Sequence, residues 1–230
     1  MQTPDLSRYL ILHRGMRADA DRLAAAVSAV VEQERTDRGH ALARWYTGYH
    51  HELHAHHTIE DSVFFPAILE RVAVFDSQVD RIEADHQRLE GLLVRSEITL
   101  ANLSDAEVDW PEAAAAATET ANELSALMRV HLDFEDTEVL PLFVRHFGLE
   151  EYEDLEERAR KGIRLGTLRF TVPWFMEAAT PDEQGTMLAD APFAFRLLWH
   201  VTRRRYRRMA HDAFGSARPA GAVPLHRQPA

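Results

Sequence analysis

The chain has 230 residues, a formal net charge of −11 at pH 7 and no cysteine. The length favours one domain, or one domain with an appendage, and the missing cysteines exclude disulfides, iron–sulfur clusters, cysteine-ligated zinc and thiol catalysis. The acidic balance argues against general nucleic-acid binding, and the chain has neither an apolar run of about 20 residues nor an amino-terminal signal pattern. We therefore expect a soluble, cytoplasmic protein that does not enter a membrane.

The first part of the chain predicts two long amphipathic helices. Apolar residues recur at helical spacing over residues 5–36, and His13 lies within that stripe. Residues 37–39 (Asp-Arg-Gly) indicate a short turn. A second helix is predicted over residues 40–72, with a bend at Pro66 because proline disturbs the interior of a helix.

The next part predicts two more helices. One covers residues 77–102 and contains His86, and the other runs from Pro111 to residue 147 after a loop. Proline suits the first turn of a helix because the missing N–H has no partner there. Four amphipathic helices joined by short turns predict an all-α fold, an up-down-up-down four-helix bundle over residues 1–148.

The chain after residue 148 predicts additional C-terminal helices. Residues 149–214 contain a charged amphipathic segment, an aromatic segment and an arginine-rich helix, and residues 180–183 (Thr-Pro-Asp-Glu) resemble a capped helix start. We expect Trp174 and Trp199 to pack this helical extension against the bundle. Residues 215–230 show no periodicity and are expected to form a disordered tail.

One motif occurs twice, in the second and fourth predicted helices. It reads HHTIEDSVFFP from His56 to Pro66 and HLDFEDTEVLP from His131 to Pro141. Both copies contain His, three residues, Glu, Asp, and Ser or Thr. A histidine and a glutamate four residues apart lie on one face of a helix, about 6 Å apart along its axis. The motif therefore presents an imidazole and a carboxylate together.

The first and third predicted helices add one histidine each. His13 precedes His56 by 43 residues, and His86 precedes His131 by 45, so the two helical hairpins have matching patterns. Nitrogen and carboxylate ligands suit iron, manganese or zinc, and two metal ions bridged by both carboxylates would use the whole set. The alternative, hydrogen-bonded core residues without a metal, would cost several kcal/mol in desolvation. The candidate ligands are His13, His56, Glu60, His86, His131 and Glu135.

This order of histidines and His-x3-Glu motifs resembles the hemerythrin-like (HHE cation-binding) family over residues 6–147. The resemblance implies a non-haem site of two iron ions with an oxo or hydroxo bridge (Fe–O–Fe or Fe–OH–Fe). By match of motif, Glu60 and Glu135 would bridge the irons, and the four histidines would be terminal ligands. It also implies a small ligand such as oxygen, peroxide or nitric oxide. Ferritin-like di-iron bundles differ because they use Glu-x-x-His.

The sequence departs from the oxygen-carrying members of that family at one position. Those proteins have a further histidine four residues after the one on the third helix, where this chain has Glu90. We expect Glu90 to face the same interior as His86, either as an extra ligand or as a hydrogen-bond partner of a ligand. A carboxylate there favours redox turnover over reversible oxygen carriage.

Two other features leave alternatives open. His50, His54, His57 and Asp61 form a separate stripe, which we interpret as a solvated face, with a second metal site as the alternative. The arginine-rich run over residues 203–208 is expected to dock on the acidic bundle or to be solvated, rather than to bind nucleic acid. A protein partner for this run stays unknown.

The predicted function is that of a di-iron protein that binds, senses or reacts with a small molecule. As an enzyme it would be an oxidoreductase acting on peroxide or nitric oxide. As a binding protein it would store or sense iron or a diatomic gas, and as a signalling module it would transmit the iron state through the C-terminal helices. The lack of cysteine argues against the iron–sulfur repair branch of the family, whose amino-terminal extension carries cysteines.

Overall fold

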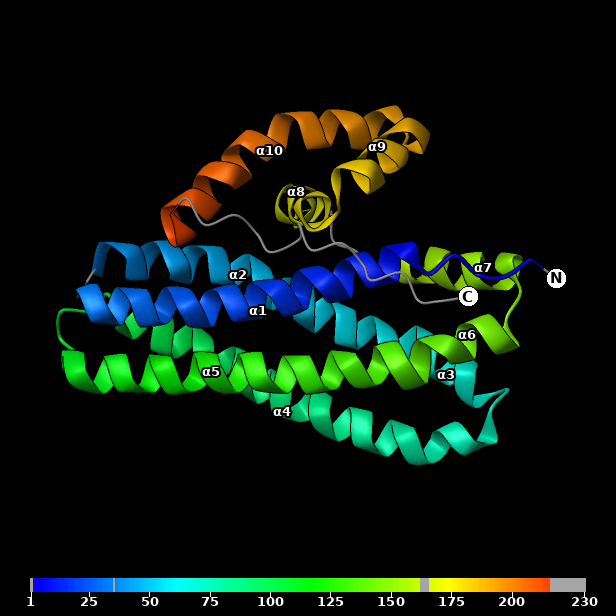
Figure 1. The fold of residues 1–230 in the computed structure, drawn as a ribbon, viewed down its shortest axis with the longest axis horizontal. Helices are drawn as coiled ribbons and strands as arrows, with labels where there is room; N and C mark the ends of the chain where they lie inside the picture. The colour runs from blue at the N-terminus through cyan, green and yellow to red at the C-terminus, as the bar shows by residue number, and fades with distance from the viewer. Residues whose placement is uncertain (1, 35, 162–165, 216–230) are drawn as a thin grey trace.

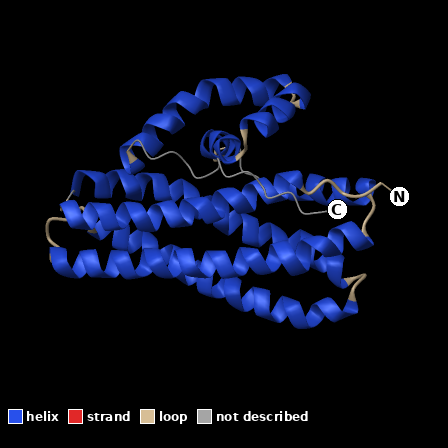
Figure 2. Cartoon of the chain, in the orientation of Figure 1, coloured by secondary structure: helices blue, strands red, loops and turns tan. Residues whose placement is uncertain are grey.

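Four long helices lie side by side in the computed structural model, which describes residues 2–34, 36–161 and 166–215 (Figure 1). Within these ranges the regular elements are all helical (Figure 2). α1 packs against α5, and α4 packs against both α5 and α2. The predicted all-α bundle with additional C-terminal helices is confirmed. The four helices are α1 (Ser7–Gln33), α2 (Thr36–Ile59), α4 (Asp76–Asn102) and α5 (Trp110–Phe134).

Each bundle helix buries one stripe of side chains against its neighbours. In α4 the buried residues Ile82, His86, Leu89, Leu93 and Leu100 follow a spacing of three, four or seven, as expected for one face of a helix. His86, a candidate metal ligand, thus lies in the same stripe as the apolar core residues of α4. This arrangement brings it to the axis of the bundle.

The turn between α1 and α2 lies earlier than the sequence pattern predicts. α1 ends at Gln33, its C-cap residue Glu34 adopts a left-handed backbone with φ of 51°, and α2 already begins at Thr36. Gly39 therefore belongs to a helix and not to a turn. Its small size has another reason, because a Cβ at Gly39 would lie 2.5 Å from the hydroxyl of Ser104.

Both motif helices pass through a π-helical turn. α2 continues through Glu60–Phe64 into α3 (Phe65–Leu69), and α5 continues through Glu135–Val139 into α6 (Leu140–His146). The N–H groups of the residues that follow the two turns donate to the carbonyls of Glu60 and Glu135, five residues back. The predicted bend near Pro66 is thus a widening of the helix.

The motif sequence explains these turns. Pro66 and Pro141 lack an N–H, and their rings would clash with the carbonyl four residues back in a regular helix. The hydroxyl of Ser62 donates to the carbonyl of Thr58 at 2.6 Å, and the hydroxyl of Thr137 donates to the carbonyl of Asp133 at 2.8 Å. These residues occupy equivalent places in the two copies, so the sequence repeat is also a repeat of backbone geometry.

The C-terminal extension covers one side of the bundle. α8 lies between α10 and the α1 and α2 helices, with α9 at the far end of α10 (Figure 1). The predicted capping box forms between Thr180 and Glu183 at the start of α9. Residues 216–230 of the predicted disordered tail lie outside the described residues. The helices of this part are α7 (Leu149–Lys161), α8 (Leu168–Ala178), α9 (Pro181–Asp190) and α10 (Phe193–Phe214).

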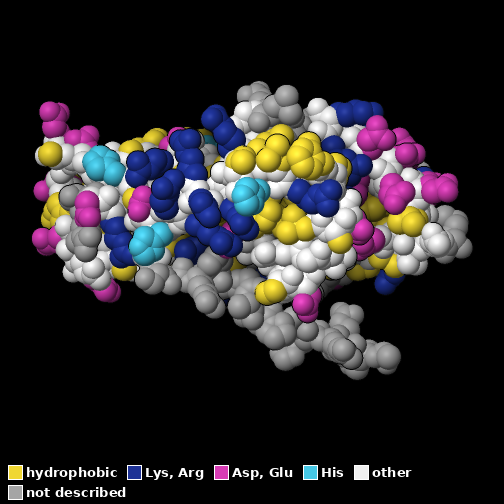
Figure 3. All heavy atoms as spheres, turned by 90° about the horizontal axis from the view of Figure 1, so that it is seen from above, with side chains coloured by type: hydrophobic (Ala, Val, Ile, Leu, Met, Phe, Trp, Pro, Cys, Tyr) yellow, Lys and Arg dark blue, Asp and Glu magenta, His cyan; other side chains and the backbone are white. Residues whose placement is uncertain are grey.

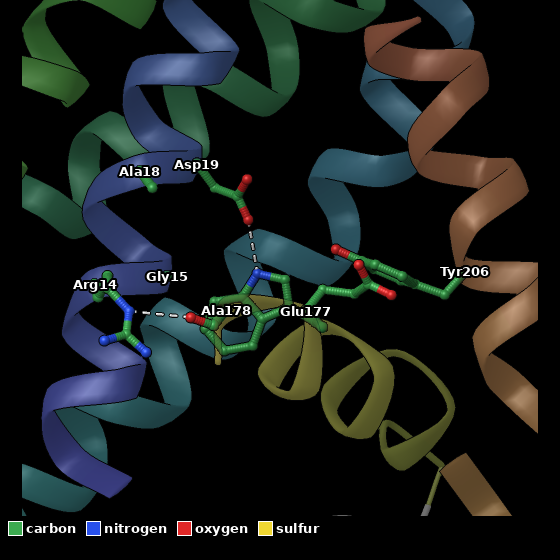
Figure 4. A pocket seen from close by; sticks show the side chains of 8 residues that line it. Arg14, Gly15, Ala18, Asp19, Glu177, Ala178 and Tyr206 are labelled. Atoms are coloured by element: carbon green, nitrogen blue, oxygen red, sulfur yellow. Dashed lines mark hydrogen bonds between the residues drawn. The ribbon is translucent and has the colours of Figure 1, made fainter. Parts of the chain in front are cut away.

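Two buried carboxylates lie where α8 meets the bundle. The indole N–H of Trp174 donates to Asp19 at 2.9 Å (Figure 4). The hydroxyl of Thr171 donates to Glu52 at 2.5 Å. Burial raises the pKa of Asp19 to about 6 and that of Glu52 to about 7. The contact is tight, because the cavity beside Asp19 and Tyr206 has a volume of about 10 Å³, room for about one water molecule.

The outer side of α10 combines exposed apolar and basic side chains. Phe193, Leu197 and Val201 are exposed at successive turns, and a hydrophobic patch with basic groups beside it is visible from that side (Figure 3). Within the arginine-rich run, Arg207 donates to Glu177 of α8 at 2.6 Å. None of the described helices combines the length and apolarity that a bilayer span requires.

Candidate metal centre

The fold brings the six predicted residues together in the bundle interior. The four histidines come from four different helices, and the two glutamates are the first residues of the two π-helical turns. All six are buried: His13, His56, Glu60, His86, His131 and Glu135 are at most 8% exposed. Their convergence was predicted from the spacing of the two motifs.

Each carboxylate lies between histidines of the two hairpins. Glu60 places Oε1 3.1 Å from Nε2 of His56 and Oε2 3.6 Å from Nε2 of His86. Glu135 places Oε1 3.4 Å from Nε2 of His131 and Oε2 3.5 Å from Nε2 of His13. The two oxygens of each glutamate thus approach different imidazoles. This arrangement suits carboxylates that bridge two metal ions.

The aspartate after each glutamate holds a histidine of the other hairpin. Asp136 lies 2.7 Å from Nδ1 of His13, and Asp61 lies 2.9 Å from Nδ1 of His86. A ring whose Nδ1–H donates to a carboxylate presents the lone pair of Nε2 to the interior. Asp136 also accepts from Arg17 at 2.8 Å. The Glu-Asp dipeptide therefore supplies a candidate ligand and orients another.

His57 enters the same interior, and its assignment to a solvated stripe was wrong. Its side chain is 5% exposed, and its ring stacks on His86 at a centroid distance of 4.2 Å and meets His131 at 5.4 Å. Donor atoms of His57, His86 and His131 lie within 4.8 Å of one another. α2 contacts both α1 and α4, so its buried face is wide enough for two successive residues. Leu132, the equivalent residue of the second motif, is also buried and could have revealed this.

Glu90 lies outside the centre, contrary to the expectation that it faces the interior. Its Oε2 is 3.1 Å from Nδ1 of His54, and its side chain is 44% exposed. The buried stripe of α4 passes from His86 to Leu89 and Leu93, to one side of Glu90. The argument against reversible oxygen carriage used an interior carboxylate at this position, so that argument no longer holds.

Tyr9 lies at the candidate metal centre and was not predicted from the sequence. It lies one helical turn before His13, and its buried hydroxyl donates to Oε1 of Glu60. Its ring lies edge-on to His13 at 4.7 Å and to His56 at 5.6 Å. Burial and the charges of Glu60 and Glu135 raise its pKa well above the ordinary value, so the hydroxyl keeps its proton. The spacing of four residues from His13 was the signal available in the sequence.

Burial and close packing shift the protonation of the metal-free cluster. Burial, followed by the neighbouring imidazoles, lowers the pKa of His56 and His57 well below the ordinary value. Burial and the charge of Glu135 raise the pKa of Glu60. Burial also opposes a charge on His86, but contacts with Asp61 and Glu135 outweigh it and raise the pKa of His86 to about 10.

The donor set fits bound metal. Oε2 of Glu60, both oxygens of Glu135 and both ring nitrogens of His57 are buried and make no well-formed hydrogen bond within the described part of the chain. Leaving such groups without partners costs about 1–3 kcal/mol each, and more where they are charged. Because these atoms converge and are imidazole nitrogens and carboxylate oxygens, iron, manganese or zinc would satisfy them.

Comparisons with known proteins agree with this chemistry. The profile described as "Hemerythrin HHE cation binding domain" matches residues 11–143. Two Arabidopsis thaliana proteins named zinc finger protein BRUTUS-like are each 24% identical to the chain, over 82% and 80% of its length. The protein named zinc finger protein BRUTUS, from the same plant, is 20% identical over 76%. The chain spans 16% of the length of each of these relatives. No solved structure gives a significant match.

Proposed function

The chain belongs to the hemerythrin HHE cation-binding family, and on that premise we propose that it holds two iron ions at which a small molecule binds, is sensed or reacts. The small molecules we propose are oxygen, peroxide and nitric oxide. Donor atoms of His13, His56, Glu60 and Glu135 form one group, and those of the remaining imidazoles form another. The proposed ligands are His13, His56, His57, Glu60, His86, His131 and Glu135.

The two glutamates carry this proposal. Each has its two oxygens directed at histidines of different hairpins, at 3.1–3.6 Å. A single metal ion would not need two such carboxylates, whereas two ions could share both. Iron bound by imidazole and carboxylate supplies redox change and open positions for a small ligand.

The surrounding residues would orient the ligands and exclude water. Tyr9 donates to Glu60, and Asp61 and Asp136 fix the rings of two histidines. Buried rings of Phe64 and Phe65 lie beside Tyr9 and His86, at centroid distances of 5.6 and 5.9 Å. A dry interior strengthens the electrostatic contacts of the centre and restricts it to small ligands.

A double variant, His56→Ala with His131→Ala, tests the metal assignment. We expect it to lose most of the bound iron and to melt at a lower temperature, because metal binding stabilises the folded state. Metal analysis, absorption spectra and thermal unfolding would measure this, with His40→Ala, an exposed residue of α2, as the control. Full iron occupancy in the double variant would contradict the assignment.

Oxygen exposure of the reduced, iron-loaded protein separates binding from turnover. A spectrum that reverts when oxygen is removed with argon indicates reversible binding. Lasting oxidation indicates redox chemistry, and peroxide consumption or nitric oxide reduction over many cycles would identify an enzyme. The same sample exposed to nitric oxide tests that ligand directly.

Iron storage or sensing without catalysis is the alternative. It is favoured by the buried carboxylates and imidazoles, because losing the metal would leave them without partners and weaken the bundle. Hydrogen exchange of the iron-loaded and iron-free protein would test this function. Sensing predicts that protection falls across the bundle when iron is removed, and equal protection in both states would oppose it.

A further inference from the structure

A second cluster of histidine and glutamate lies on the outer side of α2 and α4. His50 and His54 are four residues apart and therefore share one face of α2. Glu90 of α4 reaches across, with Oε2 3.1 Å from Nδ1 of His54 and Oε1 3.9 Å from Nε2 of His50. The His54 side chain is 57% exposed, so a cation in solution has access to the cluster.

His50 makes the same kind of contact as two histidines of the buried centre. Its Nδ1 lies 3.2 Å from Oε2 of Glu97, and its Nε2 is directed toward Glu90. His13 and His86 likewise have Nδ1 on an aspartate and Nε2 directed at the interior glutamates. A carboxylate on one ring nitrogen is the usual support of a metal-binding histidine, because it fixes the orientation and raises the basicity of the other nitrogen.

We propose that His50, His54 and Glu90 form a surface site for a divalent cation of the zinc type, separate from the buried centre. Two imidazoles and one carboxylate are a common zinc set, with water in the fourth position. Donor atoms around a tetrahedral zinc ion stand about 3.4 Å apart, given bond lengths of about 2.0–2.2 Å. The contacts of the two Glu90 oxygens with the two rings, at 3.1 and 3.9 Å, bracket that spacing. One donor atom from each of the three residues does not fall within 4.8 Å of the other two, so the exposed His54 ring would turn toward His50 when the ion binds.

The position of the site separates it from the buried centre. His50 and His54 pair with carboxylates of α4 on the outside, whereas His56 and His57 turn into the bundle. None of the three proposed ligands contributes to the buried donor groups. The proposal therefore does not depend on which metal the interior holds.

Zinc binding to the iron-loaded protein tests the proposal. Equilibrium dialysis against zinc chloride, followed by analysis of both metals, should give one zinc ion per chain with the iron retained. His54→Ala and Glu90→Gln should each weaken zinc binding at least tenfold without changing iron content. The matched controls are His40→Ala and Glu119→Gln, which replace exposed residues outside the cluster and should bind zinc as the unaltered chain does.

Three outcomes would overturn the proposal. They are no zinc bound by the iron-loaded protein, zinc bound only as iron is lost, and equal zinc affinity in the unaltered chain and in both cluster variants. The first would leave the cluster as ion pairs alone, and the second would place the zinc in the buried centre. Because iron content is measured in every sample, failure of this site is distinguishable from failure of the proposed di-iron centre.

Discussion

Asp61 and Asp136 act across the bundle, each on a histidine that belongs to the other hairpin. Their carboxylates lie 2.9 and 2.7 Å from the Nδ1 atoms of His86 and His13. A negative charge beside Nδ1 makes Nε2 of the same ring more basic and therefore a stronger metal ligand. The two aspartates therefore belong functionally to the hairpin that they contact.

Asp136→Asn should lower the affinity of the proposed di-iron centre for iron about tenfold or more, because it removes the charge behind His13 while keeping the side-chain shape. Competition with a chelator would measure the affinity. Asp133→Asn is the control, since Asp133 also pairs with Arg17, at 3.0 Å, but is mostly exposed. Equal loss of affinity in both variants would assign the effect to Arg17 instead.

At the scale of elements, the two π-helical turns lie within the two copies of the motif. Each turn begins at a candidate bridging residue and ends two residues before a proline. A widened turn rotates the side chains that follow it relative to a regular helix. The Ser and Thr hydroxyls that bond the carbonyls of Thr58 and Asp133 stabilise this backbone.

Pro141→Ala should lower the iron content while leaving the helical content unchanged, because alanine restores an N–H and allows a regular helix to form. Iron analysis and far-ultraviolet circular dichroism would measure the two effects. Pro181→Ala at the start of α9, where proline is compatible with a helix, should alter neither. An unchanged iron content in Pro141→Ala would show that the turn does not need the proline.

The sequence predicted the helices and the six converging residues because both depend on helical spacing, which a linear pattern contains. The positions of His57 and Glu90 depend on how far each helix rotates about its axis, which its neighbours decide. α2 packs against α1 and α4 within the bundle and buries His57, whereas the buried stripe of α4 passes to one side of Glu90. Tyr9 stands four residues before His13, so helical spacing already placed it on the same face. A tyrosine at that position was not expected because its ring is commonly part of an apolar core.

At the scale of the whole molecule, the extension is joined to the bundle by close contact and by two buried acids. A Cβ at Gly15 of α1 would lie 2.8 Å from Cβ of Ala178 in α8, so the helices can meet only where the side chain is absent. Glu52 and Asp19 bond to α8 in the same region. The docking of α8 on the bundle therefore depends on the absence of a side chain at Gly15 and on the protonation of Asp19 and Glu52.

Gly15→Ala should destabilise the protein by about 1–3 kcal/mol, since two helix backbones must move apart to admit the methyl group. Gly91→Ala on α4 is the matched control, because a Cβ there meets nothing within 4 Å. That variant should gain up to about 1 kcal/mol from helix propensity. Denaturant unfolding would measure the stability of both variants. Equal gains in the free energy of unfolding would show that α8 leaves room for a side chain at Gly15.

The stability of the docked extension should fall as the pH rises. The pKa of Glu52 is about 7 in the folded chain against an ordinary value of 4.5, so the folded state holds the proton more tightly than the unfolded state. The contribution is therefore complete below about pH 4.5 and is lost as the pH rises through about 7, by an amount on the order of 3 kcal/mol.

Glu52→Gln isolates this effect, because the amide keeps an acceptor for Thr171 and does not titrate. The free energy of unfolding of the iron-loaded variant should decline less between pH 5 and pH 8 than that of the unaltered chain. Glu119→Gln, an exposed change on α5, should leave the pH profile as it is. Parallel profiles for Glu52→Gln and the unaltered chain would refute the role of Glu52.

The origin of the donor atoms has a consequence for how long a metal ion would stay bound. The donors come from α1, α2, α4, α5 and both π-helical turns, and each carboxylate joins the two hairpins. In a chain without cysteine, bound metal would act as a cross-link between distant segments, from residue 13 to residue 135. Its release would require the helices to separate, so the lifetime of the complex would follow the opening rate of the bundle rather than the strength of any single bond.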